Sequence, residues 1–299
     1  MNNLPKGIIP AMVTPLDCSG NVNVESLKRL TDYLIEGGVH GLFVIGSQGE
    51  FYGLDVEQKR VAIKTVVEHV NGRVPVYAGT GATTTREAIM LTRMAADLGV
   101  DGVSVITPSF ISPNADELFL HYKEIAEVSP VPVLLYNNPG RTGVNLSADL
   151  VKRLSEVPNI VGIKDSSGDM TLLSEYIRLT RGSGRFAVLA GRDTMIFAAL
   201  MYGGTGSISA TANVAPALAA EIYDAFVARD YERALEAQFR LAPLRIAFGL
   251  GSFPVVIKEA LNLMGFDVGE TVRPVGPMKP DKRDELRNIL RNLGFKVVA

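Results

Sequence analysis

Eight short apolar runs, separated by helical patterns, constrain the fold of this chain more than any other feature. Most runs are apolar throughout rather than alternating, which is typical of parallel strands covered on both faces. A helical segment follows most of them, so the repeated unit is a strand and a helix. The runs are residues 7–13, 41–45, 74–78, 102–106, 131–136, 160–164, 186–190 and 207–209. This order predicts an α/β fold, an eight-stranded parallel β/α barrel.

The helical segments carry recognisable end signals. Asn23 is placed to cap a helix that stops at Gly37. Thr84 and Glu87 have the spacing of a capping box, and Gly99 ends that helix. Beyond residue 215 the strands stop. Helices are expected at residues 216–229, 231–250, 254–264 and 282–293. We therefore expect a barrel over residues 1–229 and a C-terminal helical appendage over residues 230–299.

An open doubly wound sheet is the rival architecture. It would usually show a G-x-G-x-x-G turn after the first strand. The two nearest segments, residues 79–84 and 204–209, both lack the third glycine. The glycine-rich segment 203–206 fits either a phosphate site or a simple turn.

Charge and cysteine content exclude several classes. The chain has 30 basic and 32 acidic residues, a net charge of -2, so it has no basic stripe for nucleic acid. The single Cys18 cannot form an intrachain disulfide, and no apolar segment of a secretion signal stands at the N-terminus, so we expect a cytoplasmic protein. No apolar run approaches the roughly 18 residues that cross a bilayer.

Lys164 is the strongest catalytic candidate. It closes the sixth run, and catalytic groups in β/α barrels stand where strands end. A lysine pointing into the barrel mouth loses hydration of its ammonium form, which favours the neutral amine that attacks carbonyls. The alternative is a solvated lysine paired with Asp165.

Two further strand ends carry polar groups. Tyr136 ends the fifth run and would either relay a proton or merely pack. Arg141, five residues on, suits a carboxylate, although a loop arginine is by default solvated. The segment GSQGE (residues 46–50) follows the second run; its backbone N–H groups and Ser47 could bind a carboxylate, and it is also an ordinary turn sequence.

Metal chemistry fits this sequence poorly. The three histidines are His40, at the wrong end of the second run, and His69 and His121, both within helical patterns. None forms a ligand pair, whereas zinc sites need three or four N or S donors. A metal-dependent aldolase is therefore disfavoured.

Taken in order, these segments resemble the dihydrodipicolinate synthase / N-acetylneuraminate lyase family of Schiff-base pyruvate aldolases. The resemblance covers essentially the whole chain. Its segments are GIIP (7–10), VTP (13–15), GSQGE (46–50), YNNPGRTG (136–143), GIKD (162–165), IS (208–209), TAN (211–213) and IKEA (257–260). It implies a Schiff base between pyruvate and Lys164, proton relay through Tyr136 and Ser47, no metal or organic cofactor, and a homotetramer arranged as a dimer of dimers.

The resemblance also bears on the second substrate. Substrate-binding residues are expected at Gln48, Gly49, Arg141 and Ile208. Arg141 resembles the arginine with which synthases meet the aldehyde carboxylate. However, Gln48 follows Ser47 where synthases usually carry two threonines, and Phe110 stands where a neighbouring subunit's tyrosine is usual. The sequence therefore predicts a lyase or synthase that activates pyruvate, dihydrodipicolinate synthase-like first. The alternatives are a 2-oxo-3-deoxy sugar acid aldolase or dehydratase and, in another class, a non-catalytic metabolite-binding barrel.

Overall fold

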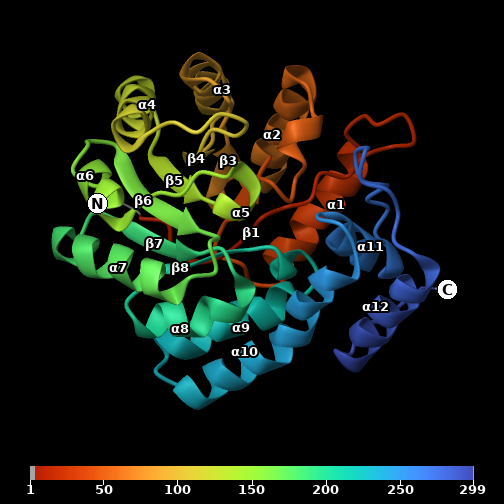
Figure 1. Ribbon diagram of the computed structural model, residues 1–299. Helices are drawn as coiled ribbons and strands as arrows, with labels where there is room; N and C mark the ends of the chain where they lie inside the picture. Colours follow the sequence, from red (N-terminus) through yellow and green to blue (C-terminus); the bar gives the residue numbers. More distant parts are fainter. Residues whose placement is uncertain (1–3, 299) are drawn as a thin grey trace.

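The computed structural model describes residues 4–298, which fold into a parallel barrel with a ring of helices (Figure 1). The strands are β1 (Gly7–Pro10), β2 (Leu42–Val44), β3 (Val76–Gly79), β4 (Gly102–Ile106), β5 (Val133–Asn137), β6 (Ile160–Asp165), β7 (Ala187–Ala190) and β8 (Gly206–Ser209). They pair in the order β1-β8-β7-β6-β5-β4-β3-β2. An Ala11–Phe43 bridge joins β1 to β2. The predicted eight-stranded barrel is confirmed.

The first strand is three residues shorter than expected, because a side chain replaces the strand ladder beyond Pro10. The Asn213 amide donates to the Ala11 carbonyl at 2.7 Å. Its oxygen accepts from the Val13 N–H at 3.0 Å. Backbone groups that would have extended the strand are therefore satisfied by a side chain four residues beyond the end of β8, which ties the two neighbouring strand ends together.

Two apolar cores flank the strands. Residues that point into the barrel form a small cluster that includes Ile9, Phe43, Leu134, Leu189 and Ile208. The alternate residues along the strands face the helices and belong to the larger cluster. Both faces of each strand are thus buried, which explains why the runs are apolar throughout.

The helices alternate with the strands and then continue past them. They are α1 (Val24–Glu36), α2 (Val56–Val70), α3 (Thr85–Asp97), α4 (Ala115–Val128), α5 (Pro139–Thr142), α6 (Ala148–Leu154), α7 (Met170–Thr180), α8 (Ile196–Met201), α9 (Pro216–Val227), α10 (Tyr231–Ile246), α11 (Val255–Leu263) and α12 (Pro280–Asn292). In Figure 1 the blue helices α11 and α12 lie on the side of α1. Hydrogen bonds such as that from the Leu16 N–H to the Val268 carbonyl, 3.1 Å, fix them there.

The expected end signals of the helices are largely present. The Asn23 side chain accepts from the Ser26 N–H and caps α1. Thr84 accepts from the Glu87 N–H at 3.3 Å and caps α3. Only one of the two hydrogen bonds of the predicted capping box forms, because the Glu87 side chain does not accept from the Thr84 backbone N–H. The prediction of a full capping box is therefore wrong. Gly99, at φ +86°, supplies the left-handed residue just beyond α3.

The glycine-rich segment at 203–206 is a turn. It lies before β8, at the barrel end opposite to the strand carboxyl ends. The Thr205 hydroxyl donates to the Pro5 carbonyl at 3.0 Å. The phosphate-site alternative is therefore wrong, because this turn lies on the wrong face of the barrel.

The C-terminal helices pack closely on the barrel. On α10, the Gln238 side chain accepts from the Phe197 N–H at 3.0 Å and donates to the Asp193 carbonyl at 2.8 Å. The division into a barrel and an appendage at residue 229 stays a prediction. A 3₁₀ turn, Ala247–Leu250, extends α10. In residues 4–298 no single helix is long and apolar enough to cross a membrane; Tyr231–Leu250 and Val255–Leu263 pass that test only jointly, bent by 117°.

Candidate active site

Lys164 lies inside the barrel mouth. It is the penultimate residue of β6, and its side chain is only 4% exposed. Its Nζ atom lies 4.1 Å from the centroid of the Tyr136 ring and 5.1 Å from that of Phe43. Aromatic faces attract a cation, although more weakly than a carboxylate would. Within residues 4–298, the Nζ atom of Lys164 has no ion-pair partner.

The proposed alternative, a pair with Asp165, does not form because neighbouring side chains on a strand point to opposite faces. Lys164 aligns with Tyr136 and Leu189 on the inward face. Asp165 faces the helices, where it accepts from the Asn137 amide at 2.9 Å and from the Ser167 hydroxyl at 2.7 Å. Burial raises the pKa of Asp165, and these hydrogen bonds act in the opposite direction.

Tyr136 and Ser47 approach each other beside Lys164. The Ser47 hydroxyl lies 3.5 Å from the Tyr136 hydroxyl, and the Asn138 amide donates to the Tyr136 oxygen at 2.9 Å. Burial by itself would raise the pKa of Tyr136, but the Lys164 charge and hydrogen bonds with Ser47, Ser166 and Asn138 hold it below the ordinary value. The phenol is therefore poised to give and take protons next to the amine.

The GSQGE segment holds Ser47 in a buried, tightly folded loop. Its last residue, Glu50, adopts a left-handed φ of +58°. Glu50 is fully buried and lies 2.6 Å from the Nζ atom of Lys258 on α11. Lys258 also donates to the Glu270 carbonyl at 2.8 Å. A charged pair thus joins this loop to the C-terminal helices.

Gln48 and Gly49 have different places in this loop. The Gln48 amide nitrogen donates to the Pro254 carbonyl at 3.2 Å, and its Oε1 atom has no hydrogen-bond partner within the described residues. Gly49 lies beneath the loop, where an added Cβ would stand 2.9 Å from the Met12 carbonyl. Gly49 does not line the cavity, so its contribution is close backbone packing.

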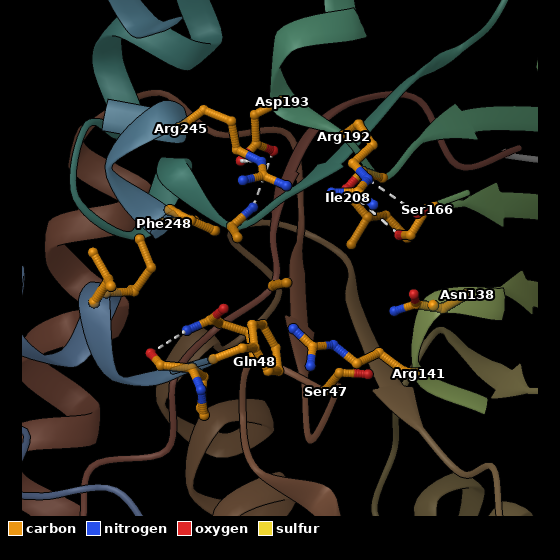
Figure 2. A pocket seen from close by; sticks show the side chains of 18 of the residues that line it. Ser47, Gln48, Asn138, Arg141, Ser166, Arg192, Asp193, Ile208, Arg245 and Phe248 are labelled. Carbon is orange, nitrogen blue, oxygen red and sulfur yellow. Dashed lines mark hydrogen bonds and ion pairs between the residues drawn. The ribbon is translucent and has the colours of Figure 1, made fainter. Parts of the chain in front are cut away.

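A cavity of about 470 Å³ opens above these residues (Figure 2). This volume is in the usual range for small-molecule sites. Six of the seven residues that the sequence singled out line it: Ser47, Gln48, Tyr136, Arg141, Lys164 and Ile208. Arg141 follows β5, and its guanidinium stacks 4.3 Å above the Phe253 ring. The structure therefore brings together strand ends that are far apart in sequence.

Five charged or aromatic residues of the cavity lining were not anticipated from the sequence. They are Arg192, Asp193, Arg245, Phe248 and Phe253. The first two directly follow β7, so the rule that placed Lys164 also applies to them. The other three come from the end of α10 and the loop that follows it. No local signal marks those three, because only tertiary packing brings this segment over the barrel.

The histidines are dispersed. His40 bonds Asp224 at 3.0 Å, His69 bonds Asp32 at 2.8 Å, and His121 bonds the Thr85 hydroxyl at 2.9 Å. Among the residues from 4 to 298, no three His, Cys, Asp or Glu side chains gather as metal ligands would.

Comparisons with known proteins agree with this geometry. A family model described as the dihydrodipicolinate synthetase family matches residues 4–293. A 4-hydroxy-tetrahydrodipicolinate synthase from Methanoculleus marisnigri is 42% identical, covering 97% of this chain and 99% of that protein. A chloride-inhibited dihydrodipicolinate synthase from Acinetobacter baumannii, solved with pyruvate, is 39% identical with a TM-score of 0.94, over 97% of this chain and 99% of that one. A dihydrodipicolinate synthase variant described as monomeric is 34% identical, with a TM-score of 0.94 and 97% of both chains covered.

Proposed function

Because this chain belongs to the dihydrodipicolinate synthetase family, and is therefore a class I pyruvate aldolase or lyase, we propose that Lys164 forms its Schiff base with pyruvate. One observation carries the assignment: the Lys164 amine is buried in the cavity, beside the Tyr136 ring, without a carboxylate partner among residues 4–298. A lysine amine placed in this way can reach the carbonyl of a molecule bound in the cavity, which is the first contact that Schiff-base formation requires.

The reaction follows from this arrangement. The neutral amine adds to C2 of pyruvate; loss of water from the carbinolamine leaves an iminium. The iminium withdraws electrons from the adjacent methyl carbon, which releases a proton and becomes an enamine. The enamine carbon attacks an aldehyde, whose oxygen takes up a proton. Hydrolysis by water then frees the product and restores the amine.

Tyr136 and Ser47 are proposed to move the protons. The Tyr136 hydroxyl is 3.5 Å from that of Ser47, and the lowered pKa of Tyr136 makes proton release from the phenol less costly. The Ser47 hydroxyl and the neighbouring backbone N–H groups are proposed to hold the pyruvyl carboxylate. Gln48 and Ile208, which both line the cavity, are proposed to contact the substrate.

For the second substrate, we propose an aldehyde that carries a carboxylate held by Arg141. The relative from Methanoculleus marisnigri is a 4-hydroxy-tetrahydrodipicolinate synthase, which supports a synthase-like condensation with aspartate semialdehyde. The alternative is a 2-oxo-3-deoxy sugar acid aldolase or dehydratase. It is favoured by Gln48, whose Oε1 atom lacks a partner within the described residues and could accept from a substrate hydroxyl.

Hydrogen exchange at the pyruvate methyl group tests the proposed function without any aldehyde. Pyruvate is incubated with the enzyme in D₂O, and the C3 protons are followed by NMR. Enamine formation predicts rapid exchange that disappears in Lys164→Ala. Exchange that persists in that variant would assign the chemistry to another group.

A homotetramer built as a dimer of dimers is also proposed. Phe110 is 98% exposed and has a left-handed φ of +75°, and Ile111 beside it is 46% exposed. Holding an aromatic residue in the left-handed region costs roughly 1–2 kcal/mol, which contact with another subunit would offset. The monomeric relative marks the contrary outcome. Sedimentation equilibrium decides between them, with Phe110→Ser expected to weaken association.

We propose a cytoplasmic location as well. It is supported by Cys18, which is exposed and is the only cysteine of the sequence, so the fold needs no oxidising compartment. Cell fractionation tests this directly; recovery in a secreted fraction would contradict it.

A further inference from the structure

We propose that Arg192 and Arg245 form a second anion-binding subsite of this cavity, which holds a carboxylate or phosphate at the far end of the substrate. The inference rests on the proposed function of the same cavity and adds the class of its substrate. Arg141 serves as the first arginine of the aldehyde half; the second subsite lies elsewhere on the cavity wall. In Figure 2, Arg245 lies beside Asp193 and Arg192 lies beside Ser166 and Ile208, and all of them are away from Arg141, Ser47 and Gln48.

Arg192 is anchored on one edge only. It follows β7 by two residues, and its Nε–H donates to the Ser166 carbonyl at 3.1 Å. Within residues 4–298, its terminal nitrogens have neither a carboxylate nor a carbonyl partner. The backbone bond fixes the plane of the guanidinium, and the free edge is left to bind a ligand. A guanidinium edge presents two parallel donors, the arrangement that matches a carboxylate or phosphate.

Arg245 is held by stacking rather than by hydrogen bonds. Its guanidinium lies 4.4 Å above the Phe248 ring, and its side chain is 19% exposed. Its nearest carboxylate is Asp193, at 3.9 Å from Nε to Oδ2, which is longer than a hydrogen bond. Stacking leaves the edges of the guanidinium free to donate.

Asp193 is hydrogen-bonded to the backbone rather than to Arg245. Its Oδ1 accepts from the Ala210 N–H at 3.2 Å, and its Oδ2 accepts from the Thr211 N–H at 3.0 Å. Asp193 is 1% exposed and holds the turn after β8. Its main role is thus to position that turn.

The charges on the cavity wall do not balance. Its lining has four basic side chains, namely Arg141, Lys164, Arg192 and Arg245, and one acidic side chain, Asp193. One pyruvyl carboxylate offsets one of these charges. Burial lowers the pKa of Arg245, Asp193 opposes this, and Arg192 lowers it further. The charge of Arg192 thus disfavours the cationic form of Arg245, and a bound anion would relieve both this repulsion and the lost hydration.

This arrangement selects a chemical class. The pyruvyl end is held at Lys164 and the distal end at Arg192 and Arg245, so the full substrate is a 2-oxo acid with a second anionic group several bonds away. The two arginines disfavour an ammonium group near the distal end, so this subsite favours the sugar acid alternative over aspartate semialdehyde as the second substrate. The class that fits is a 2-oxo-3-deoxy acid ending in a carboxylate or a phosphate, and its hydroxyls have Gln48 as an acceptor.

Paired acceptor aldehydes test the subsite. Succinic semialdehyde is compared with butanal, and glyceraldehyde 3-phosphate with glyceraldehyde, each with pyruvate; pyruvate consumption is followed. The unsubstituted enzyme should prefer the anionic member of each pair. The pair with the larger preference shows whether the subsite binds a carboxylate or a phosphate. In Arg192→Gln and Arg245→Gln, the ratio of kcat/KM for the anionic over the neutral acceptor should fall about 10- to 100-fold, the loss expected for a charge-assisted hydrogen bond. Arg240→Gln, on an exposed part of the same helix, is the matched control.

A binding measurement keeps the test decisive if turnover is slow. The enzyme is reduced with borohydride in the presence of pyruvate and titrated with glutarate and with inorganic phosphate by calorimetry. We expect the reduced enzyme to bind one of the two anions. This binding should weaken at least 10-fold in both arginine variants and should be unchanged in Arg240→Gln. An unaltered selectivity ratio, or an adduct that binds neither anion, would overturn the subsite. Failure of pyruvate to label Lys164 would instead overturn the proposed function.

Discussion

Two lysines are buried among residues 4–298, and they differ in whether a carboxylate lies beside the amine. Lys164 is 4% exposed and Lys258 is 1% exposed. Lys258 has a carboxylate at 2.6 Å and a carbonyl at 2.8 Å, whereas Lys164 faces the rings of Tyr136 and Phe43. The carboxylate and the carbonyl fix the Lys258 amine in place, whereas the Lys164 amine has aromatic faces beside it and lines the cavity. We propose that this difference in partners, rather than burial itself, is what leaves Lys164 able to react with a carbonyl.

The two lysines are also connected through one loop. Lys258 holds Glu50, and three residues earlier in the same loop Ser47 reaches the hydroxyl of Tyr136 beside Lys164. The paired lysine therefore positions the surroundings of the unpaired one. Substitutions at the two should separate loss of chemistry from loss of structure.

The largest effect is expected for Lys164→Met. Turnover should fall by about 10⁴-fold or more, roughly 5.5 kcal/mol of barrier, because the covalent step is lost. The unfolding free energy should be kept or should rise, since the amine has no ion-pair partner to lose among the described residues. Steady-state kinetics and urea denaturation measure the two quantities. If Lys164→Met kept a tenth of the activity, Lys164 would not be the residue that forms the Schiff base.

Lys258→Met should have the opposite profile. It leaves Glu50 buried and unpaired, so the unfolding free energy should fall by about 3–5 kcal/mol. The double variant Lys258→Met with Glu50→Gln should recover part of that loss, since the orphaned charge is removed. Chemical denaturation of the three variants checks this. A loss below 1 kcal/mol in the single variant would show that the pair is not structural.

Ser47→Ala should have a smaller effect, confined to chemistry. Loss of one relay hydroxyl should lower kcat by about 10²-fold, at the low end for proton-transfer groups because the Ser47–Tyr136 contact is long, 3.5 Å. Ser47→Thr keeps the hydroxyl and serves as the control. If kcat is lowered equally in both variants, the effect comes from packing rather than from the hydroxyl.

The smallest effect expected is a change in the titration of Tyr136. In the native protein, Lys164 is one cause of its lowered pKa, so Lys164→Met should raise that pKa. A lowered phenol pKa adds stability only as the pH rises above the folded pKa. Ultraviolet difference titration, with Tyr136→Phe subtracted, isolates the phenol. Lys258→Met is the control, and a pKa of Tyr136 that is unmoved in Lys164→Met would contradict the contact.

The strands and the proposed catalytic centre were predictable because local patterns encode them. Apolar runs identified the strands, and the strand-end rule then placed Lys164 and Tyr136 on one face. Arg192 was within reach of the same rule, directly after the seventh run. Arg245 was not, because it lies in a helix with no strand nearby, and only long-range packing brings it over the barrel. The ion pair of Lys258 could not be predicted from local patterns either, since its partner Glu50 is 208 positions away in the sequence.

Borohydride trapping of pyruvate tests the central claim most directly, and the two lysines give it an internal control. The enzyme is reduced in the presence of pyruvate, digested, and mapped by mass spectrometry. We predict one reduced pyruvyl group per chain, on the peptide that contains Lys164, with none on the peptide that contains Lys258. An unlabelled protein, or a label at Lys258, would contradict the account.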